Sequence, residues 1–205
     1  MRGLQKLIAV GTPIEARPLL DPASSNGDGR HRELRDLLSI ANGLYCFESA
    51  LHVLPSGGQQ MCLERWNAPD LWCDAYDDLA ADCFFFAEDV FGNQFAIRQA
   101  RIVSLEAETG QIEDVADTLE EWADQMMEDY EYLSGYPLAH AWQELNGSIT
   151  AGSRLVPKIP FVLGGEFNVD NLHELDAVKG MRWRGDLAIQ IRDLPDGASI
   201  ELKVV

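Results

Sequence analysis

The feature that most constrains this chain is the run DCFFFAEDV at residues 82–90, which is apolar on both faces of an extended strand. A strand of this kind must be covered on two sides, so we expect it to run through the centre of a sheet. The chain then returns as QFAIR (94–98), and RIVSLEA (101–107) leads to a further strand beyond the turn at Thr109-Gly110. Short neighbouring strands joined by turns are typical of an antiparallel meander. The sequence therefore predicts a central, mostly antiparallel sheet.

Helices are predicted beside these strands, because apolar residues recur every three or four positions in three segments. A short helix is expected over 34–41, and a longer one over 115–133 carries Asp and Glu along its outer face. A third helix begins with Pro137 and extends to residue 146, since proline is well tolerated in the first helical turn. Together with the strands, these helices indicate an α+β fold in which helices flank the sheet.

The remaining segments are predicted to be strands or loops. Residues 21–32 are rich in Gly, Ser and Asp and are typical of an exposed loop. Extended structure is expected at 43–55, at 61–66, at 159–163 as an edge strand, and in a hairpin formed by 186–194 and 198–205. No repeat, linker or low-complexity stretch divides the chain, so we expect a single domain.

The charge of the chain is strongly negative and unevenly distributed. The chain carries 34 Asp and Glu against 16 Lys and Arg. Residues 66–153 contain nineteen acidic residues and only two basic ones, Arg98 and Arg101. Such a field repels phosphates and anionic lipid surfaces and accelerates encounters with cations. We therefore expect a protein partner with a basic surface, and neither nucleic acid nor a membrane.

Cysteine and histidine lack the spacing of a disulfide framework or a metal site. No CxxC pair occurs among Cys46, Cys62, Cys73 and Cys83, and the four His are scattered along the chain. No stretch approaches the ~20 apolar residues of a membrane span, and the N-terminus lacks the apolar core of a signal peptide. These observations predict a cytoplasmic protein without a metal, a cofactor or a disulfide.

Two acidic patterns could carry catalytic chemistry. Pro195-Asp196, followed by Glu201 and Lys203, matches the letters of a metal-dependent nuclease core, but such a short spacing fits a plain hairpin better. The neighbours Glu88 and Asp89 could act as an acid–base pair only with unusual geometry, because adjacent strand residues point to opposite faces. Solvated carboxylates at a strand end are the simpler interpretation of this pair.

Two further patterns favour structural roles. Gly164-Gly165 lacks the longer glycine pattern of a phosphate-binding loop, so a bulge or tight turn is the better interpretation. His140 stands beside the apolar stripe of its helix without an accompanying Ser or Cys motif, which is typical of a core or boundary residue. No pattern in the sequence favours an enzyme.

Long segments of the chain resemble the SUKH superfamily, a group that includes fungal cell-wall assembly regulators and bacterial immunity proteins. A short helix ends in Asn-Gly before an aromatic strand in LRDLLSIANGLYCFESALHVLP. The other segments that resemble a bacterial branch of this group are ERWNAPDLW, CFFFAEDVFGNQFAIR, DTLEEWADQMMEDYEYLSGYPLAHAWQELNG, RLVPKIPFVLGGEFNVDNL and GDLAIQIRDLPDG. The resemblance covers residues 33–205 and leaves 1–32 as an N-terminal segment and exposed loop.

The resemblance implies an α+β fold and a non-catalytic role as an immunity protein that neutralises a toxin, often a nuclease. No catalytic residues transfer from the family. The alternative that it leaves open is a regulatory or scaffold domain of the same fold with partners in its own cell. The acidic field agrees with a nuclease partner, because a nuclease must present basic residues to phosphate.

We therefore predict that acidic side chains and a few aromatic rings bind the partner, since desolvated charge pairs and aromatic anchors dominate such interfaces. The predicted carboxylates are Asp74, Asp77, Asp78, Glu88, Asp89, Glu121, Asp124, Glu128 and Asp129. The predicted aromatic anchors are Trp72, Tyr76 and Tyr132.

Overall fold

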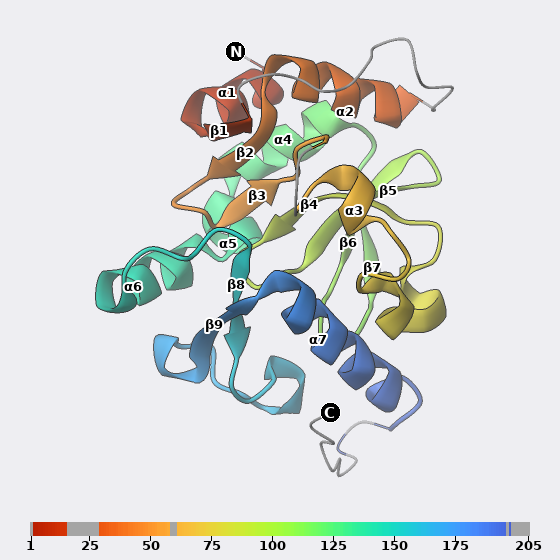
Figure 1. Ribbon diagram of the computed structural model, residues 1–205, viewed down its shortest axis with the longest axis vertical. Coiled ribbons are helices and arrows are strands. Elements are labelled where there is room, and N and C mark those ends of the chain that lie inside the picture. Colours follow the sequence, from red (N-terminus) through yellow and green to blue (C-terminus); the bar gives the residue numbers. More distant parts are fainter. Residues whose placement is uncertain (1, 16–28, 58–60, 196, 198–205) are drawn as a thin grey trace.

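An antiparallel sheet is the framework of the chain (Figure 1). The structure, a computed structural model, describes residues 2–15, 29–57, 61–195 and 197. Within these ranges seven strands form one sheet, and each strand pairs with the next along the sequence. The strands are β1 (Thr12–Glu15), β2 (Asn42–Cys46), β3 (Leu51–Val53), β4 (Phe84–Asp89), β5 (Gln94–Arg98), β6 (Arg101–Leu105) and β7 (Ile112–Ala116). The predicted meander and the α+β fold are confirmed.

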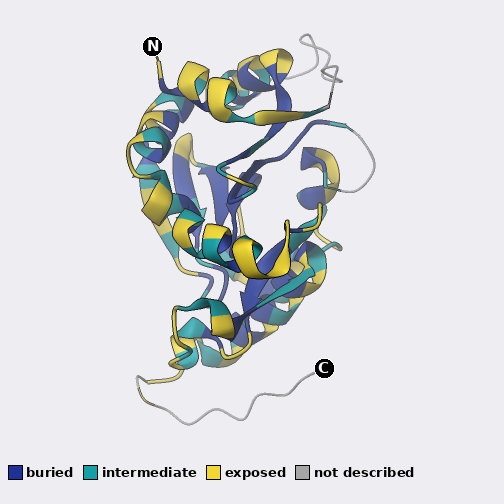
Figure 2. Cartoon of the chain, turned by 90° about the vertical axis from the view of Figure 1, so that its left-hand side faces the viewer, coloured by how far each residue is buried: buried dark blue, intermediate teal, exposed yellow. Residues whose placement is uncertain are grey.

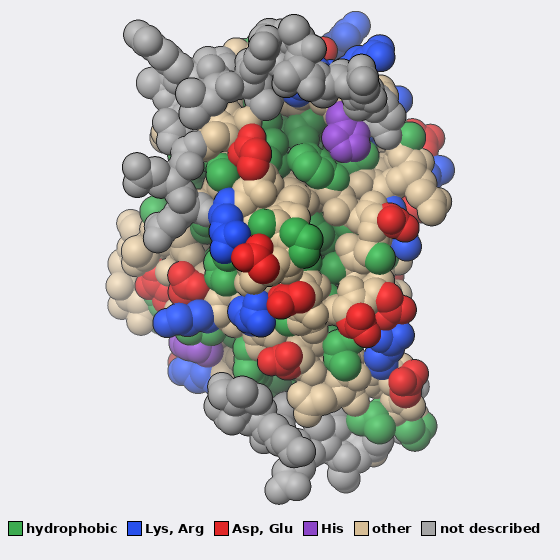
Figure 3. Space-filling view, turned by 45° about the vertical axis from the view of Figure 1, so that its right-hand side comes forward, with side chains coloured by type: hydrophobic (Ala, Val, Ile, Leu, Met, Phe, Trp, Pro, Cys, Tyr) green, Lys and Arg blue, Asp and Glu red, His purple; other side chains and the backbone are tan. Residues whose placement is uncertain are grey.

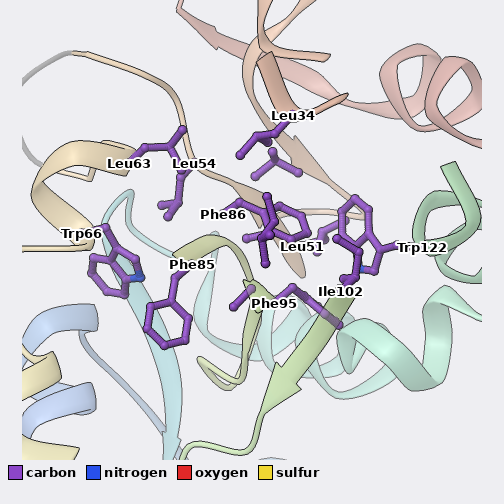
Figure 4. Close-up of a cluster of buried hydrophobic side chains, with 14 of the residues drawn as sticks. Leu34, Leu51, Leu54, Leu63, Trp66, Phe85, Phe86, Phe95, Ile102 and Trp122 are labelled. Carbon is purple, nitrogen blue, oxygen red and sulfur yellow. The ribbon is translucent and has the colours of Figure 1, made fainter. Parts of the chain in front are cut away.

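Strand β4 occupies the middle of the sheet and is covered on both faces, as its sequence predicts. The ring of Phe85 lies 4.8 Å from that of Trp72, measured between centroids. The next residue, Phe86, packs edge-on against Trp122 at 5.0 Å. Figure 4 shows these two phenylalanines within the buried cluster, Phe85 on the side of Trp66 and Phe86 on the side of Trp122. The core therefore consists of two layers separated by β4.

Helix α4 (Leu119–Glu128) covers the face of the sheet that carries Phe86. It begins at Thr118, whose hydroxyl accepts the backbone N–H of Glu121 at 3.0 Å and so satisfies one of the first N–H groups of the helix. Three other helices continue this side of the molecule or lie at its edge: α2 (Gly29–Ile40), α5 (Tyr130–Ser134) and α6 (Tyr136–Asn146). The helix predicted over 137–146 is therefore confirmed.

The helix predicted over 115–133 is divided. Val115 belongs to strand β7, and a non-helical backbone at Asp129 (φ −135°, ψ 47°) separates α4 from α5. The apolar stripe continues across this break because Trp122 and Met126 of α4 are buried and Leu133 of α5 is half-buried. A continuous stripe therefore does not require a continuous helix.

The opposite face, which carries Phe85, is covered by α3 (Leu63–Trp66), by the 3₁₀ segment η1 (Cys73–Ala80) and by α7 (Ala177–Ile191). Helix α7 packs closely on η1, because a Cβ atom at Gly185 would lie 2.9 Å from the backbone of Ala75. The remaining elements are β8 (Ser153–Pro157), β9 (Leu172–Asp176), η2 (Phe161–Leu163) and η3 (Val169–Asn171), of which β8 and β9 form a separate antiparallel pair.

Three strand predictions are wrong. Residues 186–194 were expected as a strand because Leu187, Ile189 and Ile191 alternate, yet the segment lies mostly within helix α7. The buried residues of α7 recur every three or four positions, from Ala177 through Met181 and Arg184 to Ala188, so the helical period governs. Residues 61–66 end in helix α3, and 159–163 contain the 3₁₀ turn η2. The partner strand expected at 198–205 lies outside the described residues.

The N-terminal residues belong to the same core as the rest of the chain. Helix α1 (Gly3–Val10) packs so closely on α4 that a Cβ at Gly3 would lie 2.5 Å from the backbone nitrogen of Asp124. Leu7 is 0% exposed, and β1 pairs with β2 along the edge of the sheet. The predicted boundary between a segment 1–32 and a domain 33–205 is therefore wrong for residues 3–15. The loop expected at 21–32 is wrong for residues 29–32, which belong to helix α2, and residues 21–28 lie outside the described residues.

Burial follows this layered arrangement. Figure 2 shows the buried residues along the strands and the exposed ones on the outward sides of the helices. Among the described helices, none has both the length and the apolar character that a bilayer crossing requires.

Shortening Leu7 to alanine tests whether α1 is part of the core. Because Leu7 is completely buried, Leu7→Ala is expected to lower the free energy of unfolding by about 2–5 kcal/mol in urea denaturation. The matched control is Ile40→Ala, which removes a side chain that is 72% exposed and is expected to change stability by less than about 0.5 kcal/mol. Equal effects of the two substitutions would contradict the docking of α1.

Candidate functional site

The acidic side chains of η1 were predicted to bind a partner, but two of them are already paired within the chain. Asp74 lies 2.9 Å from the guanidinium of Arg182, and Asp78 lies 2.7 Å from that of Arg192. Both arginines belong to or directly follow α7, more than 100 residues further along the sequence. Figure 3 shows this side of the molecule, where Lys and Arg are interspersed with Asp and Glu. Of these three carboxylates, only Asp77 is exposed without a Lys or Arg partner within 4 Å among the described residues, so η1 is a weak candidate surface.

The two aromatic residues predicted as anchors near η1 are internal. Trp72 and Tyr76 are both 0% exposed and pack edge to face against each other at 5.5 Å. The Tyr76 hydroxyl donates a hydrogen bond to the carbonyl of Ala107 at 2.6 Å. The prediction that these rings bind a partner is therefore wrong, because neither ring reaches the surface.

Glu88 is the centre of a buried polar network rather than a solvated carboxylate. It is 0% exposed, and one of its oxygens lies 3.1 Å from Nδ1 of His52 and 2.6 Å from the guanidinium of Arg154. Its other oxygen accepts a hydrogen bond from Gln94 at 3.2 Å. Burial alone would raise the pKa of Glu88, but the Arg154 charge and the hydrogen bonds from His52 and Gln94 outweigh burial and lower that pKa.

This network ties β3, β4, β5 and β8 together, so Glu88 has a structural role and the prediction that it contacts a partner is wrong. The ring of His52 also stacks on that of Tyr45, with 4.4 Å between the centroids, so Tyr45 covers one side of the network. Burial lowers the pKa of His52, the neutral form being favoured away from water.

Asp89 points to the other face of the sheet, as expected for the neighbour of Glu88 in a strand. It is 6% exposed, so the expectation of a solvated carboxylate is wrong here too. Its Oδ1 accepts the backbone N–H groups of Phe91 and Asn93 at 2.8 and 2.9 Å, and its Oδ2 accepts the Asn93 amide at 2.8 Å. Burial is the largest influence and raises the pKa of Asp89 to about 7 despite these bonds and the Arg184 charge.

The turn after Asp89 is anchored from beneath by α7. The buried guanidinium of Arg184 donates hydrogen bonds to the carbonyls of Phe91 and Gly180. Gly92 has a φ of +83°, and a Cβ atom there would lie 2.6 Å from Nη2 of Arg184. Both the backbone conformation and the close approach therefore require glycine at this position.

Above this turn lies a groove with a volume of about 520 Å³, which we call the acidic groove. Its floor and walls come from β4 to β7, from α4 and α5, and from the loop that carries Phe167. Among the described residues that line it there is no Lys, Arg or His. The lining carboxylates are Asp89, Glu106, Glu113 and Asp114, and the lining aromatic rings are those of Phe91, Phe95, Tyr132 and Phe167.

The carboxylates of the acidic groove differ in how far they are already neutralised. Asp114 is paired with Arg101 at 3.3 Å, although both side chains are about half exposed or more. Glu106 accepts hydrogen bonds from the Thr109 N–H and hydroxyl at 2.8 and 2.5 Å, and Glu113 accepts one from Gln111 at 3.0 Å. In the described part of the chain no Lys or Arg lies within 4 Å of Glu106 or Glu113, so both negative charges lack a counter-ion there.

Helix α4 joins the acidic groove at Gln125, which lines it and donates a hydrogen bond to the carbonyl of Val115 at 3.1 Å. Glu121 and Asp129 lie four residues before and after Gln125, so they share its side of the helix. The predicted residues Glu121, Asp124, Glu128 and Asp129 are all exposed, although Glu121 also accepts the backbone N–H of Asp117 at 2.9 Å. Tyr132 is 82% exposed and lines the groove.

The structure thus brings together two of the predicted residues, Asp89 and Tyr132, with others that were not predicted. Glu106, Glu113 and Asp114 were missed, although the expected hairpin after residue 101 offered a signal. Ser104 of β6 pairs with Glu113 of β7 across that hairpin, and Glu106 stands two residues after Ser104, directly beyond the end of β6. These three side chains therefore form a polar stripe along one side of the hairpin. Phe167 could not be found from the sequence, because a long connection brings it to the groove.

The other patterns considered for chemistry have structural explanations or lie outside the described residues. Gly164 has a φ of +87° and follows η2, which confirms the tight turn predicted there. His140 is exposed and lies 2.8 Å from Glu48, so its expected core or boundary position is wrong. The nuclease-like pattern at 195–203 falls almost entirely outside the described residues. Within the described ranges, no three His, Cys, Asp or Glu side chains are grouped to hold a metal ion.

Comparison with known proteins gives a fold and no family. No protein-family model matches the chain, and no curated protein matches it. The α+β architecture recurs in a solved structure, described as the crystal structure of Atu4351 from Agrobacterium tumefaciens. The two share 12% sequence identity with a TM-score of 0.53, over 87% of this chain and 86% of that one. At this identity the similarity shows the fold alone.

The unusual environment of Asp89 predicts a measurable titration. Its carboxyl is expected to lose its proton at a pKa of about 7, against 3.8 for an ordinary Asp carboxyl, and ¹³C NMR of the side-chain carboxyl reports the midpoint. Between these two values the native state binds a proton that the unfolded state has lost. The contribution of Asp89 to the free energy of unfolding therefore falls as the pH rises from about 4 to about 7, and is constant above that. A midpoint close to 3.8 would contradict the burial of this group.

Proposed function

We propose that this chain is an immunity protein, a non-catalytic domain that binds and blocks a basic toxin in the cytoplasm of the cell that it protects. The observation that carries the proposal is the acidic groove, in which four carboxylates and four aromatic rings line about 520 Å³ and no lining residue described is basic. A concave surface of one charge sign focuses the electric field and accelerates association with an oppositely charged protein.

The kind of partner follows from complementarity. A nuclease must present Lys and Arg to the phosphates of its substrate, so its active-site surface is basic. An inhibitor that docks carboxylates on that surface gains rapid, electrostatically steered association and keeps the substrate out. In this proposal, the identification of the partner as a toxin rests on the resemblance to the SUKH superfamily, and the identification of the binding surface rests on the acidic groove.

The proposed role requires no catalysis or cofactor. Glu88 and Asp89, the one adjacent pair of carboxylates considered as acid and base, lie on opposite faces of the sheet. Glu88 is held by Arg154 and His52 inside the protein, and Asp89 is held by the turn that follows it. Because they lie on opposite faces of the sheet, Glu88 and Asp89 cannot contact the same substrate.

Co-expression with the protein encoded beside this chain tests the proposal. We expect the chain to restore growth of cells that produce that protein, and the purified pair to form a complex with about nanomolar affinity. Because the association is steered by charge, its rate constant is expected to fall at least about tenfold when sodium chloride is raised from about 0.05 to 0.5 M. Absence of both protection and complex would remove this function.

A charge-matched pair of variants locates the surface. Glu113→Gln with Asp114→Asn removes two charges from the acidic groove, and Glu131→Gln with Glu144→Gln removes two exposed charges outside it. The first double variant is expected to slow association by about threefold to tenfold more than the second, measured by stopped flow at low salt. Equal effects of the two variants would place the binding surface elsewhere.

A further inference from the structure

We propose that the acidic groove is a receptor for an arginine side chain of the partner protein, with the guanidinium lying against the exposed aromatic rings and the carboxylates. This inference rests on the proposed function and goes beyond it by naming the group that the groove recognises. The occupant is a residue of a protein, because the groove is continuous with the exposed acidic side of α4 at Gln125.

The aromatic walls are the first observation that points to a guanidinium. Tyr132 is 82% exposed and Phe167 is 65% exposed, although both rings could bury apolar area if they were covered. Phe167 is held in place by Phe91 and Phe161 at centroid distances of 5.4 and 5.0 Å, so its position is set by packing. A planar, weakly hydrated guanidinium stacks on such rings better than an ammonium group does.

The distribution of acceptors is the second observation. Glu106 and Glu113 carry charges without a basic partner in the described part of the chain; Glu113 lies on β7, and Glu106 directly follows the neighbouring strand β6. The side-chain oxygens of Ser104, Gln111 and Gln125 add neutral acceptors around them. A guanidinium has five N–H donors in a fixed plane and can use several separated acceptors at once, whereas an ammonium is a point charge.

The floor of the groove sets how deeply the guanidinium reaches. Both oxygens of Asp89 are occupied by the turn at Phe91 and Asn93, and Arg184 already places a positive charge beneath that turn. Asp89 therefore shapes the floor without offering a vacant oxygen. Both oxygens of Glu106 likewise accept hydrogen bonds from the turn at Glu108 and Thr109. The strongest contacts with an incoming arginine therefore fall to Glu113 on β7 and to the ring of Tyr132.

Small probes test this assignment on the full chain without knowledge of the partner. Acetyl-Gly-Arg-Gly-amide is titrated into ¹⁵N-labelled protein, and the side-chain amide signals of Gln111 and Gln125 report occupancy of the groove. We expect saturable shifts, binding at least threefold weaker for the lysine peptide, and binding at least tenfold weaker for the peptide with uncharged citrulline.

Variants show which contacts are used. Glu113→Gln is expected to weaken binding of the arginine peptide about tenfold, and Tyr132→Leu, which keeps an apolar side chain without the ring, about threefold. The matched control is Glu131→Gln, which removes an exposed charge on the same helix as Tyr132 outside the groove and is expected to leave affinity within twofold. Equal losses from Glu113→Gln and Glu131→Gln would overturn the assignment.

Other occupants are outcomes of the same titration. Spermidine that binds as tightly as the arginine peptide would overturn the proposal in favour of a free polyamine, and equal binding of the lysine peptide would overturn the preference for a guanidinium. No shift at Gln111 and Gln125 at tens of millimolar peptide would overturn the site itself. If the peptide does not bind but the chain still protects cells and forms a toxin complex, only the arginine site is excluded and the proposed function stands. If the peptide binds but no toxin complex forms, the proposed function is excluded and the arginine site stands.

Discussion

The alternation of side chains along β4 is the constraint on which the rest of the structure depends. Phe85 and Phe86 point to opposite faces, so each face must be covered by its own layer of helices and loops. A register shift between Phe85 and Ala87 interrupts this alternation, and beyond it Glu88 and Asp89, three residues further on, again point to opposite faces. One carboxylate is enclosed by Arg154, His52 and Gln94, and the other forms the floor of the acidic groove. A single strand therefore supplies both the centre of the core and the base of the candidate site.

The strands around β4 could be predicted because their signals are local. Period-two alternation and the turns at 91–93 and 109–110 specify neighbouring antiparallel strands without reference to distant residues. The prediction failed where the apolar residues fit both the two-residue period of a strand and the 3.6-residue period of a helix. This is the case in α7, where Leu187, Ile189 and Ile191 alternate. There the helix is favoured because Gly185 packs against η1 and Arg184 is buried. Neither contact can be predicted from a short segment of sequence, because the partner residues are distant along the chain.

The candidate site shows a similar division. Asp89 was among the predicted residues because an acidic pair at the end of an apolar strand is visible in the sequence, and Tyr132 because it is an aromatic residue within an acidic segment. The acids of η1 were overvalued, because a count along the sequence cannot show that Arg182 and Arg192 return to neutralise Asp74 and Asp78. The negative charge of η1 is therefore partly neutralised in the folded chain. The acidic groove, in contrast, keeps carboxylates that have no basic neighbour among the described residues. Charge patterning predicts a surface only after the fold has decided which charges meet.

Gly92 links this surface to the interior of the protein. A larger residue there would have to displace the guanidinium that holds the carbonyl of Phe91, and the turn beneath the groove would lose its attachment to α7. The shape of the acidic groove thus depends on Gly92, a residue that does not line it. Among relatives of this chain, substitutions should accordingly be tolerated more readily at the rim of the groove than at position 92, where the addition of one methyl group would disturb the turn that forms its floor.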